Sequence, residues 1–225
     1  MKLRIKFAKR GVVKYIGHLD LMRYFQKAFR RTDIKVKYSG GFSPHMIMSF
    51  AQALGVGVES EGEYFDVEVE DGQDVSLMVQ KLNEQMVEGI TVKEITVLPE
   101  KAGNAMASVA ASLYEIDFYE GENPISESTV EKYKALDTLS FTKKTKSGEN
   151  TFNIKDFVYS IEYISNGIRF TCDSSSSGNL KPKFLVDSLI KLEDKDPEAY
   201  PFHILRHELY LRKADGGLAP LNYVE

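Results

Sequence analysis

Alternation between hydrophobic and polar residues predicts a strand at the start of the chain. Over residues 2–8, Leu3, Ile5 and Phe7 alternate with lysine and arginine, which is the period of a half-buried strand. From residue 18 to 32 the apolar positions recur every three or four residues instead, as they do on the buried face of a helix. The apolar stripe of this predicted helix consists of Leu21, Met22, Phe25, Ala28 and Phe29.

The same two patterns recur further along the chain. Strands are predicted over 34–38, 63–70 and 90–98, and a helix over 74–87 with Asp74 as its N-cap. The resulting order, βαββαβ, is the ferredoxin-like plan. In this plan both helices cover one face of the sheet and the other face stays open.

A second series of predicted strands and helices follows a linker at 99–111. The Pro, Gly, Asn and small residues of this linker favour irregular structure. Asn166-Gly167 is typical of a hairpin turn, and Pro182 suits the first turn of a helix. Strands are predicted over 113–118, 139–145, 157–164, 168–172 and 202–211, helices over 126–136 and 183–192, and a helical or irregular insertion over 150–156. The predicted fold class is α+β, with two ferredoxin-like (βαββαβ) halves in tandem at 1–98 and 112–225.

Charge is distributed very unevenly along the chain. The 225 residues carry a net charge of −4, but residues 1–50 hold 12 Lys/Arg and 2 acids, a balance of +10. The remaining residues hold 17 Lys/Arg and 31 acids, a balance of −14. Such asymmetry favours an anionic partner for the basic segment. The alternative is that the basic and acidic parts of the chain face each other.

Cysteine content and hydropathy exclude several classes of protein. Cys172 is the only cysteine, which excludes a disulfide framework, a cysteine-rich zinc site and an iron–sulfur cluster built by this chain alone. No apolar run of the signal-peptide kind follows the N-terminus. The longest uncharged stretch, 38–58, is too polar to span a bilayer. We therefore expect a cytoplasmic protein without a membrane segment, and we predict no metal and no cofactor.

The predicted helix over 18–32 places basic residues opposite its apolar stripe. We call four of them the basic ridge: Arg23, Lys27, Arg30 and Arg31. Only Asp20 stands close enough along the helix to pair with one of them. An uncompensated basic helix face is typical of a surface that contacts phosphate groups, although it also occurs as a solvated face. The cations expected to extend this ridge are Lys9, Arg10, Lys14, Lys35 and Lys37.

A glycine-rich loop follows the helix. Its candidate binding residues are Ser39, Gly40, Gly41, Phe42 and His45. The glycines let a phosphate approach the backbone closely, and Phe42 can stack on a base. His45, together with His18 at the start of the helix, is a candidate for acid–base chemistry. The alternative for each histidine is a capping or packed side chain.

A second phosphate-binding candidate precedes the predicted helix at 183–192. It consists of Ser177, Gly178, Asn179 and Lys181, because the N-terminus of a helix can bind anions through its free N–H groups. The alternative is a flexible loop between a hairpin and a helix. His203 and His207 fall in the last predicted strand, and we interpret them as ordinary sheet residues.

Several segments together resemble a bacterial protein family. They are the strand Arg4–Phe7, Gly17-His18-Leu19-Asp20-Leu21-Met22-Arg23, Tyr38-Ser39-Gly40-Gly41-Phe42-Ser43-Pro44-His45 and Leu54-Gly55-Val56-Gly57-Val58-Glu59-Ser60. In these segments the chain is similar to the radical-SAM-linked proteins of the DUF2344 domain family, although Gly17 and Met46 stand where that family usually has Ser and Pro. The resemblance implies a radical SAM protein, fused or encoded nearby, as partner. It implies no catalytic mechanism.

Three functional hypotheses are compatible with these residues. The leading one is a non-catalytic accessory module of a radical SAM enzyme that binds RNA, with tRNA as one candidate, through the basic ridge and the 39–45 loop. The second is a metal-independent RNA endonuclease that resembles CRISPR RNA-processing nucleases of the Cas6 type, with His18 or His45 as its catalytic residue. The third is a pure protein-interaction subunit, whose ridge docks on an acidic surface of its partner.

Overall fold

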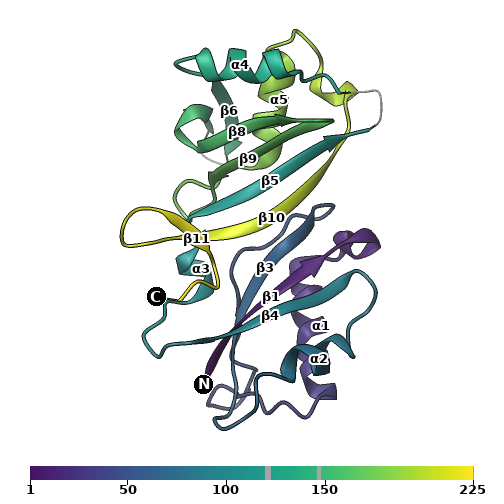
Figure 1. Ribbon diagram of the computed structural model, residues 1–225, viewed down its shortest axis with the longest axis vertical. Coiled ribbons are helices and arrows are strands. Elements are labelled where there is room, and N and C mark those ends of the chain that lie inside the picture. Colours follow the sequence, from purple (N-terminus) through teal and green to yellow (C-terminus); the bar gives the residue numbers. More distant parts are fainter. Residues whose placement is uncertain (120–122, 146–147, 225) are drawn as a thin grey trace. The chain divides into compact units, whose positions relative to one another are not determined.

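The computed structural model describes residues 1–119, 123–145 and 148–224, which form two compact units. Unit 1 comprises Met1–Ala110 together with the chain from Arg206 onward, and unit 2 comprises Ala111–Leu205. Among the described residues of each unit, strands outnumber helices (Figure 1), and the chain is of the α+β class. The segment from Arg206 onward, which the sequence pattern assigned to the second half, thus belongs to unit 1.

Unit 1 begins in the order strand, helix, strand, strand, helix, strand. These elements are β1 (Lys2–Lys9), α1 (His18–Arg31), β2 (Met48–Phe50), β3 (Glu59–Glu68), α2 (Met78–Asn83) and β4 (Ile90–Leu98). A 3-10 turn, η1 (Gly11–Tyr15), precedes α1. The unit is completed by α3 (Ala105–Ser108), the C-terminal part of β10 (Phe202–Arg212) and β11 (Leu218–Pro220).

The sheet of unit 1 is built around β1. This strand pairs antiparallel with β4 on one side and β3 on the other, so that Ile5 lies opposite both Ile95 and Phe65. β2 pairs with β3 and aligns Phe50 with Phe65, while β10 also neighbours β3 and carries β11. Successive residues of each strand therefore face opposite sides of this sheet.

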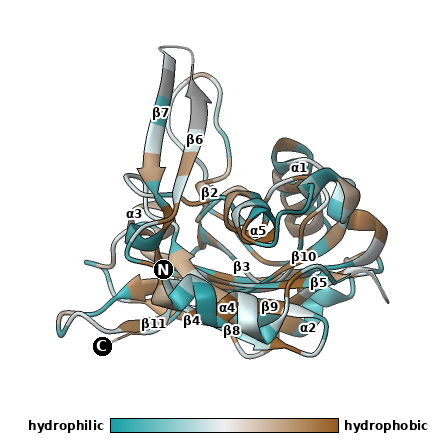
Figure 2. Ribbon diagram, turned by 90° about the horizontal axis from the view of Figure 1, so that it is seen from above, coloured by the Kyte–Doolittle hydropathy of each residue, from teal (hydrophilic) through white to brown (hydrophobic). Residues whose placement is uncertain are grey.

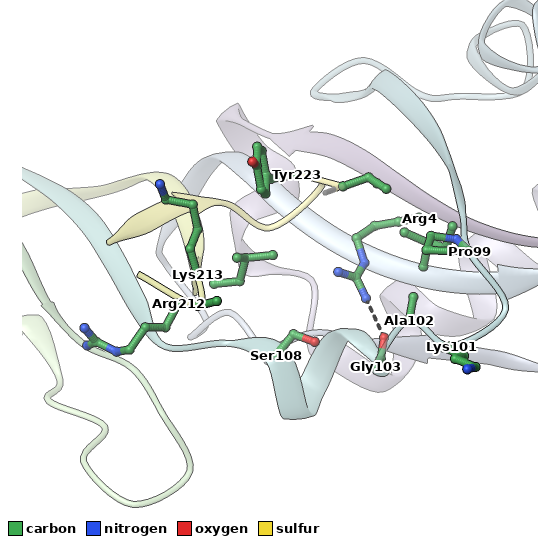
Figure 3. A pocket seen from close by; sticks show the side chains of 13 residues that line it. Arg4, Pro99, Lys101, Ala102, Gly103, Ser108, Arg212, Lys213 and Tyr223 are labelled. Atoms are coloured by element: carbon green, nitrogen blue, oxygen red, sulfur yellow. Dashed lines mark hydrogen bonds between the residues drawn. The ribbon is translucent and has the colours of Figure 1, made fainter. Parts of the chain in front are cut away.

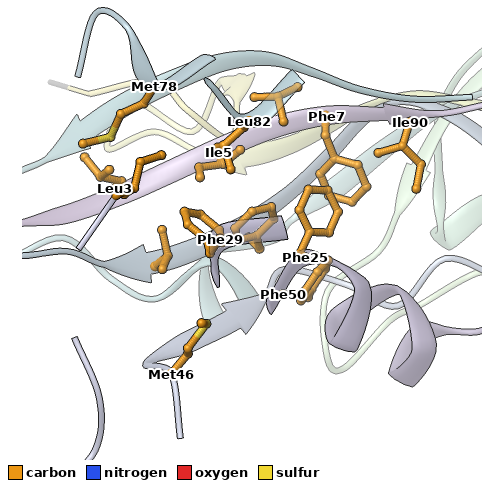
Figure 4. Close-up of a cluster of buried hydrophobic side chains, with 14 of the residues drawn as sticks. Leu3, Ile5, Phe7, Phe25, Phe29, Met46, Phe50, Met78, Leu82 and Ile90 are labelled. Carbon is orange, nitrogen blue, oxygen red and sulfur yellow. The ribbon is translucent and has the colours of Figure 1, made fainter. Parts of the chain in front are cut away.

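The helices α1 and α2 cover one face of this sheet, where the core of unit 1 lies (Figures 1 and 4). The Phe25 ring of α1 sits 4.8 Å from the ring of Phe7 and 4.8 Å from that of Phe65. Phe50 stacks on Phe65 at 5.0 Å, and Leu82 of α2 is fully buried. Burial of these large aromatic side chains fixes α1 on the sheet, which turns the opposite side of the helix to solvent.

The other face of this sheet is covered as well, although the sequence pattern predicted an open face. Leu209 and Leu221, from the C-terminal segment, are fully buried there beside Tyr64. Under this cover the Arg4 guanidinium contacts the Asp66 carboxylate at 2.7 Å, with both side chains almost completely buried. The βαββαβ plan does not include this cover, because it comes from chain more than 100 residues further on.

The predicted helix over 74–87 is much shorter in the structure and begins at Met78. Asp74 does not cap it. Instead the Asp74 carboxylate accepts hydrogen bonds from the Ser76 amide at 2.9 Å and the Ser76 hydroxyl at 2.6 Å. Such local side-chain-to-backbone hydrogen bonds compete with helix formation, so the chain forms a turn at 74–77 before α2 starts.

The predicted strand over 34–38 is reduced to two isolated bridges, which join Val36 to Val69 and Tyr38 to Met46. The regular strand at this position in the order is β2, at Met48–Phe50. The Tyr38–Met46 bridge closes the 39–45 loop, so the segment serves as the base of a loop rather than as an inner strand of the sheet.

Unit 2 carries its own sheet and two longer helices. Its elements are β5 (Ala111–Phe118), α4 (Glu127–Ala135), β6 (Ser140–Thr145), β7 (Gly148–Asn153), η2 (Ile154–Asp156), β8 (Val158–Ile164), β9 (Gly167–Asp173), α5 (Pro182–Lys191) and η3 (Pro197–Ala199). β9 pairs antiparallel with both β5 and β8. β6 and β7 form a separate two-stranded ribbon (Figure 2). The helical or irregular insertion predicted over 150–156 is a strand up to Asn153 and the 3-10 helix η2 after it.

The helices of unit 2 begin where the sequence signals indicate. The Ser126 hydroxyl accepts a hydrogen bond from the Thr129 amide and caps α4, while Pro182 opens α5. Leu185 and Leu189 of α5 are fully buried in the core of this unit. Across the described parts of both units, no helix combines the length and the apolar character that crossing a bilayer requires.

Candidate nucleic-acid interface

The basic ridge lies on the solvent side of α1. The opposite side of the helix is buried in the core, and all four ridge side chains are exposed. Arg23 lies 3.4 Å from Asp20, but both side chains are more than two-thirds exposed, and such surface pairs contribute little. Lys27, Arg30 and Arg31 have no acidic partner among the described residues. These three side chains therefore present uncompensated positive charge to solvent.

Two of the cations expected to extend the ridge are neutralised inside unit 1, which corrects that expectation. The Arg10 guanidinium contacts the carboxylates of Glu61 at 2.5 Å and Glu59 at 3.2 Å, and Lys14 lies 3.9 Å from Glu59. Burial raises the pKa of Glu59, but hydrogen bonds from the Gly11 amide and from Arg10 outweigh it and hold that pKa below its usual range. The acids of β3 thus balance the charge of the chain that precedes α1.

Lys9 does not belong to the ridge either, because it is buried at the end of β1. Its ammonium group donates to the carbonyl oxygens of Lys14 at 3.2 Å and Ile16 at 2.7 Å. Burial lowers the pKa of this ammonium group. Lys9 therefore holds the turn before α1 in place instead of meeting a ligand.

The basic side chains of β1 also pair with acids of unit 1. Arg4 lies opposite Asp66 in the pairing of β1 with β3, and the two side chains form an ion pair. Lys6 pairs with Glu208 at 2.5 Å, because the C-terminal segment brings that carboxylate close to β1. Of the cations before α1, Lys9 is therefore buried against backbone carbonyl oxygens, and the others pair with acids of the same unit.

The chain that leaves α1 continues the uncompensated surface. Between residues 21 and 58 the only acid is Asp33, and Lys81 already holds its carboxylate at 2.9 Å. Lys35 is exposed and has no acidic partner among the described residues. Lys37 is partly neutralised by Asp71. The Met1 ammonium group, and to a smaller extent Lys37, hold the pKa of the Asp71 carboxyl below its usual range.

The loop between Ser39 and His45 is a short, closed turn that displays an aromatic ring. The Ser39 amide donates to the His45 carbonyl oxygen at 2.8 Å, and the Ser39 hydroxyl lies 2.9 Å from His45 Nδ1. Gly41 has a φ of +97°, a conformation that glycine adopts at little cost. Phe42 is fully exposed at the tip. The loop therefore holds the Phe42 ring out into solvent, where it is accessible to a ligand.

The two candidate catalytic histidines occupy different settings. His18 is half-buried at the start of α1, and its ring meets Phe50 edge-on at 5.3 Å. His45 is exposed and closes the loop through Ser39. No contact joins them within the described residues, and an acid–base role for either stays a prediction. The other histidines, His203 and His207, lie in β10, as the pattern predicted.

A cavity of about 370 Å³ opens beside the 39–45 loop, and the sequence pattern did not single it out. It is lined by Lys2, Ser39, His45, Met46, Ile47, Met48, Ser49, Asp66, Val67, Glu68 and Asn104. The alternation over 63–70 puts Asp66 and Glu68 on the same face of a strand. It could not show that the loop and Asn104 close over them, since those contacts join distant parts of the chain.

The second phosphate-binding candidate, the loop around Gly178, has a carboxylate at its centre. A side-chain carbon added at Gly178 would lie 2.6 Å from an oxygen of Asp173, and the Asp173 carboxylate accepts a hydrogen bond from the Ser175 amide at 2.8 Å. Ser177, Gly178 and Asn179 also line a small cavity of about 90 Å³ whose other residues are apolar or aromatic. Phosphate binding by this loop and Lys181 stays a prediction, and the observed surroundings are less basic than those of α1.

Another hollow in unit 1, of about 320 Å³, is lined by cations but does not gather their charges. These cations are Arg4, Lys101, Arg212 and Lys213. Figure 3 shows the head groups of Lys101 and Arg212 pointing away from Arg4, whose guanidinium donates to the Gly103 carbonyl oxygen at 3.1 Å. Convergent donors, which an anion site requires, are therefore not assembled there.

Comparison with known proteins places the chain in a family. Among the described residues, no three His, Cys, Asp or Glu side chains gather as a metal site would require. No curated protein is similar enough in sequence to be matched. A family model described as an uncharacterized protein conserved in bacteria matches residues 2–182, which includes α1, the 39–45 loop and the cavity beside it. The chain therefore belongs to the DUF2344 family.

Proposed function

We propose that unit 1 binds RNA through the basic ridge of α1 and the 39–45 loop. The observation that carries the proposal is the set of exposed cations Lys27, Arg30, Arg31 and Lys35, which have no acidic partner among the described residues. The cations before α1 are paired or buried within the unit. The unpaired cations are therefore confined to α1 and the residues after it, and they do not reflect a general excess of positive charge. Uncompensated Lys and Arg on one helix are the footprint of phosphate contacts.

The 39–45 loop favours single-stranded RNA as the ligand. Proteins that bind single strands combine a basic track with aromatic side chains on which bases stack. Phe42 supplies such a ring, fully exposed, at the end of the basic segment that starts at Arg23. Duplex RNA offers stacked bases that this ring cannot reach, so a loop, bulge or end of a structured RNA is the better substrate.

We also propose that each half of the chain follows the ferredoxin-like plan. In unit 1 the elements run β1-α1-β2-β3-α2-β4, and β1 lies between β4 and β3, with β2 on the far side of β3. In unit 2 the elements β5, α4, β8, β9 and α5 follow in the same order, with the ribbon of β6 and β7 added. The plan itself hosts many functions, so the argument for RNA rests on the ridge.

An accessory role beside a radical SAM enzyme of the cytoplasm completes the proposal. It is supported by the sequence resemblance and by an exposed apolar surface at the start of α1. Val12, Tyr15, Leu19 and Val56 are each at least 60% exposed, and the hydrogen bond from the Gly57 amide to the Lys14 carbonyl oxygen ties the two loops of this surface together. An apolar surface next to a basic ridge suits a partner protein that acts on the bound RNA.

A titration with RNA tests the proposal. Fluorescently labelled tRNA and an unstructured oligonucleotide are titrated with the protein at several salt concentrations. We expect Lys27→Gln/Arg30→Gln to weaken binding and to reduce the slope of log K against log salt by about 1.4, since each lost contact to a single strand is worth about 0.7. Lys134→Gln/Lys191→Gln, which removes the same charge from unit 2, should leave both values unchanged.

Two results would overturn this assignment. Equal losses in both double variants would show that net charge, rather than the ridge, attracts RNA. Unchanged affinity in the ridge variant would remove the ridge from the interface. The partner is tested separately by co-expression with the radical SAM protein encoded nearby, where Leu19→Asp should abolish co-purification and Lys27→Gln/Arg30→Gln should not.

A further inference from the structure

The cavity beside the 39–45 loop has a floor of polar side chains in fixed register. Lys2 lies opposite Glu68 in the pairing of β1 with β3, and Ser49 lies opposite Asp66 in the pairing of β2 with β3. Residues opposite each other across strands project to the same face, and Asp66 and Glu68 are two positions apart on one strand. All four side chains therefore stand on the face of the sheet that is turned away from the core and into the cavity.

One of the two floor carboxylates is already saturated. Asp66 accepts hydrogen bonds from Arg4 Nε at 2.7 Å and Arg4 Nη2 at 3.0 Å, and from the Ala105 amide at 2.8 Å. It also lies 3.4 Å from the Lys2 ammonium group. These contacts give Asp66 a structural role, because they hold the start of α3 against the sheet.

The other carboxylate, that of Glu68, is free to accept hydrogen bonds. The structure describes backbone hydrogen bonds of this residue to Ile47 and Lys37 and its strand pairing with Lys2, and no donor to its carboxylate within the described residues. Glu68 is half-buried in the wall of a cavity of about 370 Å³. A half-buried carboxylate without donors is an incomplete site, because its two oxygens can accept a pair of hydrogen bonds.

A donor stands on another wall of the same cavity. Asn104 is the N-cap of α3, and its side-chain oxygen accepts a hydrogen bond from the Ala107 amide at 2.8 Å. This bond fixes the orientation of the amide group, so its NH₂ group remains available as a donor. Lys2 anchors the same turn by donating to the carbonyl oxygens of Ala102 and Gly103, each at 3.3 Å. The cavity thus offers two adjacent acceptors and one donor.

We infer that this cavity binds a guanine base. Guanine alone among the four RNA bases carries two adjacent donors, N1–H and the N2 amino group, on its Watson–Crick edge, followed by the acceptor O6. A carboxylate such as that of Glu68 complements the two donors, and the Asn104 amide complements O6. The volume is at the small end of the roughly 300–1,000 Å³ typical of ligand sites, which suits one nucleotide.

This inference rests on the proposed RNA binding for the source of the guanine, and it specifies which base is recognised. Ser39 and His45, the two ends of the loop that displays Phe42, also line the cavity. A base in the cavity and a neighbouring base stacked on Phe42 would therefore belong to one strand. Base-specific reading of single-stranded RNA uses this combination of stacking and hydrogen bonds to the Watson–Crick edge.

Two titrations test the inference and separate it from the proposed function. In the first, GMP, AMP, CMP, UMP and IMP are each titrated into the protein and followed by NMR or calorimetry. In the second, labelled eight-residue oligouridylates with a single central G, A, C or I are titrated by fluorescence anisotropy. We expect G to bind about ten-fold more tightly than A or C in both series, within the range for a bidentate carboxylate–base contact. Hypoxanthine should bind less tightly than guanine, because it lacks the N2 amino group.

The variant Glu68→Gln should abolish the preference for guanine while leaving the affinity for the all-uridine oligomer unchanged. The matched control is Glu70→Gln, which removes the same charge two residues further on and outside the cavity. Equal affinities for all bases, or a guanine preference that survives in Glu68→Gln, would overturn the inference. Salt-dependent oligomer binding without base preference would leave the proposed function intact and refute only the guanine site. Preference for GMP without any oligomer binding would retain the site for a free guanine nucleotide and refute RNA binding.

Discussion

The cations of the first fifty residues fall into two groups with opposite roles. Those before α1, including Arg4 and Arg10, pair with acids of β3 and of the C-terminal segment. On and after α1, the exposed cations Lys27, Arg30, Arg31 and Lys35 have no acidic partner among the described residues. The comparison shows that a block of like charge in a sequence can serve two purposes, one structural and one available for a ligand. The two groups should therefore respond to mutation in different assays.

The largest expected effect comes from breaking a buried pair of the first group. Arg4→Ala leaves the almost completely buried Asp66 without its main partner, and such a loss typically costs about 3–5 kcal/mol. We expect a fall of this size in the free energy of unfolding, measured with urea. The control is Lys27→Ala, which also removes one charge but should change stability by less than about 0.5 kcal/mol. Similar losses in the two variants would mean that the two groups of cations do not differ as described.

A smaller effect is expected from the aromatic ring at the tip of the 39–45 loop. Because Phe42 is fully exposed, Phe42→Ala should leave the unfolding free energy unchanged. The free energy with which this variant binds single-stranded RNA should be weaker by about 1–3 kcal/mol, the usual contribution of one stacked base. The slope of log K against log salt should stay at its wild-type value, since no phosphate contact is lost.

The variant Phe42→Tyr provides the matched control, because it keeps an aromatic face in the same place. We expect it to bind RNA as tightly as the wild-type protein. If Phe42→Leu binds equally well, the ring contributes to RNA affinity through apolar contact and not through stacking. If Phe42→Ala binds as tightly as the wild-type protein, the loop lies outside the interface.

Local patterns were sufficient to predict most of the elements that carry the site. The 3.6-residue period and the position of the cations predicted α1 and its exposed ridge, because both depend on residues within a few turns of one helix. The glycines and Phe42 predicted an exposed loop at 39–45 for a similarly local reason. The strand over 90–98 was predicted with its observed ends, because most of its residues are β-branched, which favours a strand.

Contacts between distant residues could not be predicted in this way. Nothing near Lys6 in the sequence indicates that its partner is Glu208, 202 residues away, and nothing near Glu68 indicates that Asn104 shares its cavity. The cover over the second face of the sheet in unit 1 has the same origin, since it comes from the C-terminal segment. Both the neutralisation of the first group of cations and the guanine cavity depend on such contacts, so they become visible only in the folded chain.

The smallest expected effect concerns the pH dependence of the pairs around Arg10. The pKa values of Glu59 and Glu61 are held below their usual range: burial raises them, but hydrogen bonds from Gly11 and Arg10 to Glu59, and from Lys93 and Arg10 to Glu61, outweigh it. A carboxyl with a lowered folded-state pKa stabilises the fold above its unfolded pKa, about 4.3 for glutamate. That contribution is lost as pH falls through the lower, folded-state pKa.

Urea unfolding at pH 7 and at pH 3 measures this contribution. Because Arg10 is 41% exposed and the two carboxylates are about one-quarter exposed, the pairs together should contribute no more than about 1 kcal/mol. Glu59→Gln/Glu61→Gln should therefore be slightly less stable than the wild-type protein at pH 7 and should lose less stability on acidification. Lys27→Gln/Arg30→Gln should keep the wild-type pH dependence, because Lys27 and Arg30 have no carboxyl partner to titrate among the described residues. An unchanged pH dependence in the glutamine variant would show that these acids do not neutralise the first group, and the distinction between the two groups of cations would then rest on the buried pairs alone.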